Sequence, residues 1–322
     1  MASLAEKVLQ GDRLALSRLI SHIENNIPDH DAELDGLFSH TGKAYLIGIT
    51  GPSGAGKSTL VNHLAQTLAC AEGGSHPNKI GIIAVDPTSP FSGGALLGDR
   101  VRMHALTKDP NIFIRSMASR GALGGIAQAV DGTALAMDAA GFEIIIIETI
   151  GAGQSEVEVA RLAHTTIVVE APGLGDDIQA AKAGILEIAD ILVVNKSDKH
   201  GAASTAQALQ AMLALGKELQ AQNNKTNHVD WEVPVIKVSA LNGDGIGTLT
   251  DQVLAHRTFL ETSGEWEIRS HARLRTLLEK LIKETLFETW NTPKNQKIME
   301  EMLALAAEKK KSPHQIVKNL LK

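Results

Sequence analysis

A glycine-rich stretch that ends in a lysine and a serine carries the strongest chemical signal in this sequence. Residues 51–59 match the spacing G-x-x-x-x-G-K-[ST]. The glycines let the backbone curl so that its N–H groups converge on phosphate oxygens, and a following helix adds its positive N-terminal dipole. Lys57 is expected to contact the β- and γ-phosphates of a nucleoside triphosphate, and the Ser58 hydroxyl to bind Mg²⁺. The predicted phosphate-binding residues are Gly51, Pro52, Ser53, Gly54, Ala55, Gly56, Lys57, Ser58 and Thr59.

An acidic residue directly after a buried strand is the expected partner of such a phosphate loop. The run Ile144–Ile147 reads as a buried strand and is followed by Glu148, whose carboxylate can hold Mg²⁺ directly or through water. Beyond it, the stretch Gly151-Ala152-Gly153-Gln154 suggests a loop that approaches a γ-phosphate and rearranges when that phosphate leaves. The simpler alternative is a strand-end glutamate that only caps a helix.

Two aspartates are further candidates for the metal shell. Asp86 follows the apolar run Ile80–Val85 and is therefore expected at the carboxyl edge of a sheet, where ligands of open α/β sheets bind. Asp99 follows the glycine-rich stretch Ser92-Gly93-Gly94. Taken alone, each aspartate is more simply explained as a turn residue or a solvated acid.

A second motif, Asn195-Lys196-Ser197-Asp198, follows the apolar run Ile191–Val194 and predicts the base. The Asp198 carboxylate can accept hydrogen bonds from guanine N1–H and N2–H₂, whereas adenine would leave it without a donor. We expect Asn195 to bond the edge of the base and the stem of Lys196 to cover the ring. A backbone N–H of Ser239-Ala240-Leu241 can meet guanine O6. The motifs therefore predict GTP and GDP as ligands.

The elements that must position these motifs form an α/β fold. Short apolar runs alternate with amphipathic segments of helical length, which predicts a mostly parallel sheet flanked by helices. Residues 2–25 read as two helices separated at Gly11-Asp12, with Asp12 as N-cap, and 27–41 reads as a linker. The predicted domains are an N-terminal helical extension (1–41), a nucleotide-binding domain (42–262) and a C-terminal helical extension (263–322). The predicted strands are Ala44–Thr50, Ile80–Val85, Ile112–Arg115, Glu143–Glu148, Thr165–Glu170, Ile191–Asn195 and Val235–Ser239, and the late helices are Trp266–Trp290, Lys294–Lys309 and Ser312–Leu321.

Composition narrows the class of protein. The formal net charge of −6 argues against nucleic acid as a partner, because such proteins usually carry a basic surplus. No apolar run approaches the roughly 20 residues of a membrane span, and the N-terminus lacks the pattern of a secretory signal, so the cytoplasm is the expected location. Cys70 is the only cysteine, which excludes an internal disulfide and a CxxC metal site.

The order of motifs resembles the MeaB/ArgK group of G proteins, which includes the protein defective in methylmalonic aciduria type A. The likeness runs from Gly11–Ala15 to Ser312–His314. Generic GTPases lack its most specific segments, which are Ala84–Ser89, Gly93–Met103, Glu148–Glu156 and Pro172–Lys182. An older label ties the group to transport of lysine, arginine and ornithine, but nothing in this sequence resembles a transporter component.

The resemblance implies a function and a set of partners. It implies Mg²⁺ held near Ser58, Asp86, Asp99 and Glu148, and a homodimer in which the C-terminal helices act as a dimerisation arm. Members of the group act as chaperones for adenosylcobalamin-dependent acyl-CoA mutases of the methylmalonyl-CoA mutase type. They gate cofactor loading and protect the mutase from inactivation.

The predicted reaction is transfer of the γ-phosphoryl group to water, which the protein promotes by positioning and charge stabilisation. Ala152 cannot orient water, and Gln154 lies two residues further on, so intrinsic hydrolysis is expected to be slow and to accelerate when a partner orders the loops. The resemblance marks Pro172–Lys182 as a third switch, where Gln179 and Lys182 are catalytic candidates; a solvated helix lysine is the alternative for Lys182.

Three other classes of protein remain to be weighed. A metallochaperone GTPase would need clustered cysteine and histidine, yet the chain has one cysteine and scattered histidines. A non-hydrolysing binding module would leave Gly151, Gly153 and Gln154 without a purpose. A small-molecule kinase would leave the Asn195–Asp198 motif unexplained.

Overall fold

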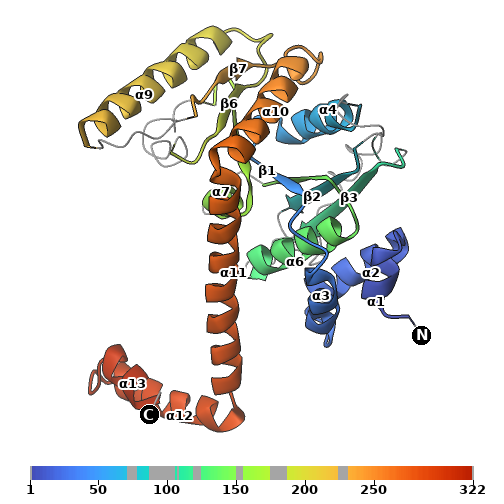
Figure 1. Cartoon of the computed structure of the whole chain (residues 1–322). Helices are drawn as coiled ribbons and strands as arrows, with labels where there is room; N and C mark the ends of the chain where they lie inside the picture. Colours follow the sequence, from blue (N-terminus) through green and yellow to red (C-terminus); the bar gives the residue numbers. More distant parts are fainter. Residues whose placement is uncertain are drawn as a thin grey trace. The chain divides into compact units, whose positions relative to one another are not determined.

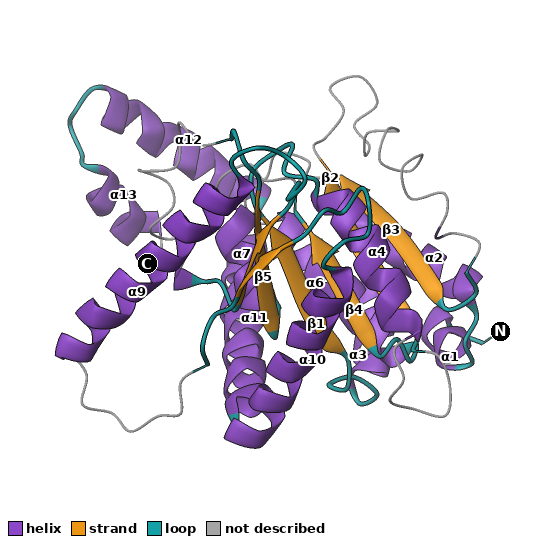
Figure 2. Cartoon of the chain, turned by 90° about the horizontal axis from the view of Figure 1, so that it is seen from above, coloured by secondary structure: helices purple, strands orange, loops and turns teal. Residues whose placement is uncertain are grey.

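The centre of the structure is a seven-stranded sheet in the order β3-β2-β4-β1-β5-β6-β7, in which every strand pairing is parallel (Figure 1, Figure 2). This is a computed structural model, and it describes residues 2–70, 78–86, 106, 109–118, 125–149, 155–174, 187–223 and 231–320. The predicted α/β class is confirmed. The strands are β1 (Tyr45–Thr50), β2 (Ile80–Asp86), β3 (Ile112–Ala118), β4 (Ile144–Glu148), β5 (Thr165–Glu170), β6 (Ile191–Val194) and β7 (Val235–Lys237).

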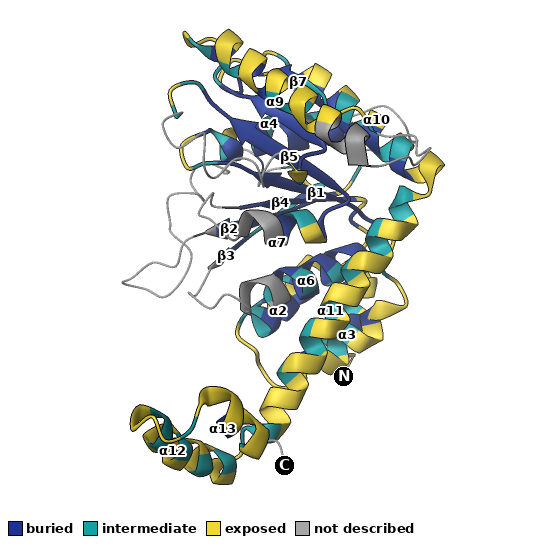
Figure 3. Cartoon of the chain, turned by 90° about the vertical axis from the view of Figure 1, so that its left-hand side faces the viewer, coloured by how far each residue is buried: buried dark blue, intermediate teal, exposed yellow. Residues whose placement is uncertain are grey.

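Both faces of the sheet are covered by helices, which explains why its central strands are apolar throughout. Every residue of β1, β4 and β5 is buried, and β4 is the central isoleucine strand expected from the sequence. Alternate side chains of the strands point to opposite faces, so β1 sends Ile47 into one core and Leu46 into another. The strands lie dark blue between the helical layers in Figure 3.

One core lies under α4 (Lys57–Cys70) and α10 (Ile246–Ser263), and the core on the opposite face lies under α6 (Gly125–Ala139) and α7 (Ser155–Leu162). A third, smaller cluster packs α9 (Ala202–Asn223) on β6. Helices α4, α6, α7 and α9 each lie between two consecutive strands, and α10 follows the last strand. All strand pairings are parallel, so the strands all end at the same edge of the sheet. All the loops that follow the strands therefore gather at the carboxyl edge, where the predicted motifs lie.

The N-terminal extension consists of α1 (Leu4–Leu9), α2 (Arg13–Glu24) and α3 (His30–Phe38). Asp12 caps α2 as expected, because its carboxylate accepts the N–H groups of Leu14 (2.8 Å) and Ala15 (3.0 Å). The predicted linker over 27–41 is wrong, since α3 occupies most of it. Leu34 and Leu37 are the hydrophobic residues by which α3 joins the core, and Glu33 accepts the N–H groups of Leu4 and Ala5, so the apolar face of α3 is too short to stand out in the sequence.

The chain divides into two compact units, Met1–Ser270 and His271–Lys322. A single helix, α11 (Glu265–Trp290), crosses this division and is followed by α12 (Pro293–Ala307) and α13 (Pro313–Leu320). Thr292 caps α12 by accepting the N–H of Asn295 (3.3 Å), and the Trp290 indole donates to the Leu320 carbonyl (3.1 Å). The three late helices agree with the sequence prediction to within one or two residues.

A buried polar cluster closes the amino edge of the sheet, opposite the motifs. His256 of α10 is fully buried, with Nδ1 2.7 Å from the Thr165 hydroxyl and Nε2 3.4 Å from the Asp190 carboxylate. Arg269 donates two hydrogen bonds to Asp190, both 2.9 Å long. The Tyr45 hydroxyl hydrogen-bonds Thr165 and donates to the Val253 carbonyl.

This burial predicts a pH dependence of stability. Desolvation lowers the pKa of His256 to about 4. The negative charge of Asp190 raises this pKa, and the positive charge of Arg269 offsets part of that increase. In the unfolded chain this histidine takes up a proton near pH 6.5, and in the folded chain it does so only near pH 4. The free energy of unfolding therefore decreases as the pH falls between these two values, by up to about 3 kcal/mol. Urea unfolding at pH 7 and pH 4.5 should show a smaller loss in His256→Gln than in the wild type.

Because many carboxylates also titrate in this range, the comparison needs a histidine control. His200 is exposed, so His200→Gln should lose the same stability as the wild type between the two pH values. Equal losses in the wild type and in both variants would show that His256 does not titrate differently in the folded chain.

Candidate functional site

The phosphate loop lies between β1 and α4, as predicted. Gly51, Gly54 and Gly56 have φ values of 138°, 79° and 90°, in the region that side chains other than glycine rarely adopt. A Cβ on Gly51 would stand 2.0 Å from the Val169 carbonyl oxygen, and one on Gly56 would stand 2.4 Å from Nδ2 of Asn195. Gly51 and Gly56 are therefore required for space as well as for backbone conformation.

Lys57 is the first residue of α4, and its side chain folds back over the loop. Its Nζ donates to the carbonyls of Gly51 (2.7 Å) and Pro52 (3.0 Å), and the residue is only 6% exposed. The ammonium group is thus held within the curve of the loop, above the helix N-terminus. A cation in this place can bind the phosphates of a nucleotide.

The predicted metal ligands Ser58 and Glu148 come together. The Ser58 hydroxyl donates to Oε1 of Glu148 at 2.6 Å, and Glu148 is 7% exposed. A hydroxyl and a buried carboxylate in contact are two hard oxygen donors, the ligand type that Mg²⁺ prefers. The backbone brings Asp86 to the same edge, because Ala84 pairs with Glu148 and Asp86 is the last residue of β2.

Four predicted site residues lie outside the described residues: Asp99, Gln154, Gln179 and Lys182. Their roles therefore stay predictions.

Asn195 joins the base motif to the phosphate loop. Its Nδ2 donates to the Ala55 carbonyl (2.8 Å), and its Oδ1 accepts the N–H groups of Lys196 (2.8 Å) and Ala240 (3.0 Å). The sequence predicts this side chain at the edge of the base and gives no sign of its contacts within the protein. No local signal could have revealed them, because Ala55 lies 140 residues away.

Lys196 reinforces the same connection. It has φ 57°, and its Nζ donates to the Gly54 carbonyl at 2.6 Å. The left-handed backbone turns the chain at the end of β6, so that Asn195 and Lys196 both reach the phosphate loop. The parts that would bind phosphate and base are therefore held together by direct hydrogen bonds.

The Asp198 carboxylate is exposed at the end of the predicted base motif. The Ser239 hydroxyl donates to its Oδ1 at 2.7 Å, and this bond, with a bond from the Asp198 backbone, holds the pKa of the carboxyl below its ordinary value. Asp198 is consequently ionised at neutral pH. Leu241 lies in the loop between Ser239 and α10 and is 83% exposed, so its side chain is free to contact a planar ring.

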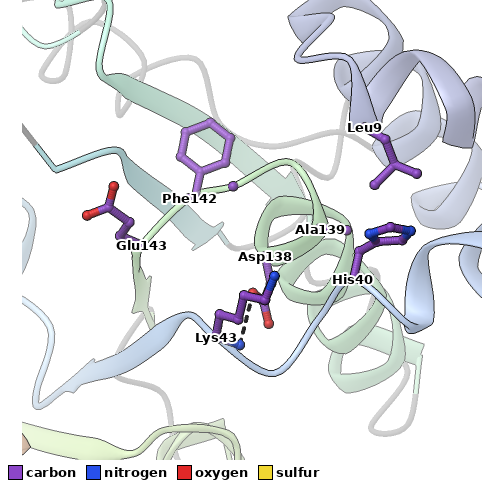
Figure 4. A pocket seen from close by; sticks show the side chains of 8 residues that line it. Leu9, His40, Lys43, Asp138, Ala139, Phe142 and Glu143 are labelled. Carbon is purple, nitrogen blue, oxygen red and sulfur yellow. Dashed lines mark hydrogen bonds between the residues drawn. The ribbon is translucent and has the colours of Figure 1, made fainter.

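A pocket of about 300 Å³ lies at the opposite edge of the sheet and contains none of the predicted site residues (Figure 4). Within it, Asp138 of α6 accepts the backbone N–H groups of Gly42 (2.6 Å), Lys43 (3.3 Å) and Ala44 (3.1 Å). This carboxylate fastens the chain where it enters β1, which is a structural role. The pocket is lined by Leu9, His40, Lys43, Asp138, Ala139, Gly141, Phe142 and Glu143.

The described residues contain neither a candidate membrane span nor a cluster of metal-binding side chains. None of their helices combines the length and apolarity needed to cross a bilayer. In the same part of the chain, no three His, Cys, Asp or Glu side chains lie close enough to share a metal ion.

The fold and the site together define a P-loop GTPase: a parallel sheet carries a phosphate loop, an acid beside the Ser58 hydroxyl, and the Asn195–Asp198 motif at the same edge. Comparison with known proteins gives the family. A model of the family described as "Methylmalonyl Co-A mutase-associated GTPase MeaB" matches residues 16–295, and the chain belongs to this family.

Individual relatives agree with this assignment. A protein of Pyrococcus abyssi named as a GTPase is 40% identical over 319 residues, which cover 99% of this chain and 95% of the relative. The "Methylmalonic aciduria type A homolog, mitochondrial" of Mus musculus is 34% identical over 248 residues, 77% of this chain and 57% of the relative. A solved structure, "Crystal structure of LAO/AO transport system kinase", has a TM-score of 0.70 and 26% identity, and covers 98% of this chain and 95% of that one. The protein therefore binds guanine nucleotides and hydrolyses GTP.

Proposed function

We propose that this GTPase is a chaperone of an adenosylcobalamin-dependent acyl-CoA mutase of the methylmalonyl-CoA mutase type, which gates cofactor loading and protects the mutase. The single observation that carries the proposal is the family match over residues 16–295, because the description of that family names the mutase. The name of the mouse relative, which refers to methylmalonic aciduria, supports the same partner.

The nucleotide is proposed to bind with Mg²⁺. Ser58 and Glu148 would hold the ion, with Asp86 and Asp99 completing its shell. Bound there, Mg²⁺ would supply positive charge that offsets the negative charge of the phosphates. Lys57 binds the same phosphates from within the loop, and the buried surroundings of Lys57 and Glu148 keep water from screening these charges.

Intrinsic hydrolysis is proposed to be slow until a partner orders the catalytic loops. Ala152 offers no group that orients water, and Gln154, Gln179 and Lys182 are the candidates for completing the site. Lys182 would neutralise charge on the transferred phosphoryl group. A Lys182→Ala variant whose partner-stimulated rate equals that of the wild type would remove this role.

Binding to candidate mutases tests the proposed partner. The protein would be mixed with methylmalonyl-CoA mutase or an isobutyryl-CoA homologue, in the presence of GDP or a non-hydrolysable GTP analogue, and binding measured by calorimetry. We expect binding whose affinity depends on the nucleotide, because the nucleotide can act on the partner only by favouring one state of the protein. Absence of binding to every mutase in both nucleotide states would contradict the proposal.

The second compact unit is proposed to form a homodimer. Leu274, Leu278, Ile282 and Leu286 of α11 recur every four residues and are 38–65% exposed, so one helix face presents an apolar stripe. A second copy of the chain would cover it.

Light scattering after size exclusion tests the dimer. The wild type should elute as a dimer and the double variant Leu278→Glu/Ile282→Glu as a monomer, because two charges would lie in the apolar contact. Leu215 of α9 is an exposed leucine of the first unit, at 59%, and its change to Glu should leave the dimer intact. A double variant that remains dimeric would place the contact elsewhere.

A further inference from the structure

Helix α7 lies between the nucleotide site and the first turn of α11. It begins at Ser155, seven residues after Glu148, and runs along β1 towards the amino edge of the sheet. A Cβ on Gly48 of β1 would stand 2.6 Å from the Val159 side chain and 3.0 Å from that of Ala163. The helix therefore rests directly on the β1 backbone, and Gly48 leaves no side chain between them.

The end of α7 is joined to α11 through His164. The Leu46 N–H donates to Nδ1 of this histidine (3.1 Å), so Nδ1 carries no proton and Nε2–H is left to donate to the Ser270 hydroxyl (3.3 Å). The imidazole also stacks on the Trp266 indole, with 4.1 Å between ring centroids. One side chain thus contacts β1 on one side and α11 on the other.

Arg269 strengthens this junction and extends it to a third element. Its guanidinium donates to the His164 carbonyl at 2.7 Å and to the Asp190 carboxylate. Asp190 directly precedes β6, the strand that leads to Asn195 and the base motif. The first turns of α11 are therefore bound both to the end of α7 and to the start of a strand that carries nucleotide-binding residues.

We infer that the contacts of His164 with Trp266, Arg269 and Ser270 couple the nucleotide state at the phosphate loop to the position of the first turns of α11. A displacement of α7 along β1 would move His164, and three separate contacts would pass that movement to α11. This inference rests on GTP binding by the protein and not on the identity of any partner. Coupling is reciprocal, so a change at the junction must also alter the relative affinities for GTP and GDP.

Hydrogen exchange on the full-length protein tests the coupling directly. Peptides covering 258–272 should exchange at different rates with GDP and with a non-hydrolysable GTP analogue, and His164→Asn should remove the difference. Asparagine can keep the hydrogen bond to the Leu46 N–H while losing the ring that stacks on Trp266. Arg275, an 82% exposed arginine of the same helix, provides the control variant Arg275→Ala, which should behave like the wild type.

Nucleotide affinities give a second, independent readout. In His164→Asn, the ratio of the dissociation constants for GDP and the GTP analogue should shift by roughly 5-fold, the lower end of typical allosteric couplings, while Arg275→Ala leaves it unchanged. Should His164→Asn fail to fold, Ser270→Ala removes one of the three contacts and should shift the ratio in the same direction by less. Peptides 258–272 that exchange identically in both nucleotides, while peptides covering 44–60 show that nucleotide is bound, would overturn the inference.

Discussion

Replacing Asp198 by asparagine is expected to transfer the nucleotide preference of the protein from GTP to xanthosine triphosphate. The carboxylate is ionised and hydrogen-bonded by Ser239, and we propose that it accepts from N1–H and N2–H₂ of guanine. An asparagine amide keeps one acceptor but turns a donor towards the guanine amino group, where two donors then face each other. Xanthine carries a carbonyl at that position and accepts from the amide. We expect affinity for GTP to fall by at least about 10²-fold.

Calorimetry with GTP, GDP, xanthosine triphosphate and ATP checks this expectation. Ser239→Ala is the matched control, because it removes the hydroxyl that supports Asp198 while leaving the carboxylate in place, so GTP affinity should fall less and guanine should still be preferred. An Asp198→Asn protein that binds GTP as tightly as the wild type would place the base elsewhere.

Replacing Lys57 by alanine is expected to reduce the rate of GTP hydrolysis by about 10²-fold or more. A buried cation near the transferred phosphoryl group stabilises the charge of the transition state far more strongly than it would in water. The loss should be larger for GTP than for GDP, since the ammonium reaches both the β- and the γ-phosphate. The loop carbonyls of Gly51 and Pro52 also lose their donor, so a moderate loss of stability should accompany the change.

Single-turnover hydrolysis and titrations with both nucleotides separate these effects. Lys43 is an exposed lysine just before the start of β1, away from the phosphate loop. The control variant Lys43→Ala should therefore hydrolyse GTP at the rate of the wild type. If Lys57→Ala retained the wild-type rate, the phosphate loop would not be the catalytic centre.

The parts that could be predicted from the sequence are those whose physical cause is local. The phosphate loop needs glycines at fixed spacing, the buried strand β4 is four consecutive isoleucines, and Asp12 caps the helix that starts one residue later. Each of these signals lies within a few residues of the feature it predicts. The sequence also predicts that the phosphate loop and the loop at Asn195–Asp198 lie close together, because parallel strands all end at the same edge of the sheet.

The features that escaped prediction depend on contacts between distant residues. Helix α3 is held by Leu34 and Leu37 and by the bonds of Glu33 to the start of α1, and its own apolar residues form only a short face. The hydrogen bond of Asn195 to the phosphate loop joins residues 140 positions apart, and that of Arg269 to Asp190 joins residues 79 positions apart. No local sequence pattern predicts contacts over such separations. The sequence likewise does not predict that His256 is buried and neutral, because its burial and its lowered pKa both result from the elements packed around it.

The bond between Asn195 and Ala55 also has a consequence for how the protein is made. At roughly 5–20 residues per second, a ribosome needs about 7 to 27 seconds to go from the phosphate loop to Asn195. Strands β4 and β5, the neighbours of β1, are made only within that interval, so the loop at first has the bonds of its own Lys57 and none from the rest of the sheet. A growing chain of this protein therefore cannot complete the bonds that hold the phosphate loop until more than half of its length has been made, and GTP in the cell can stabilise the complete site only after that point.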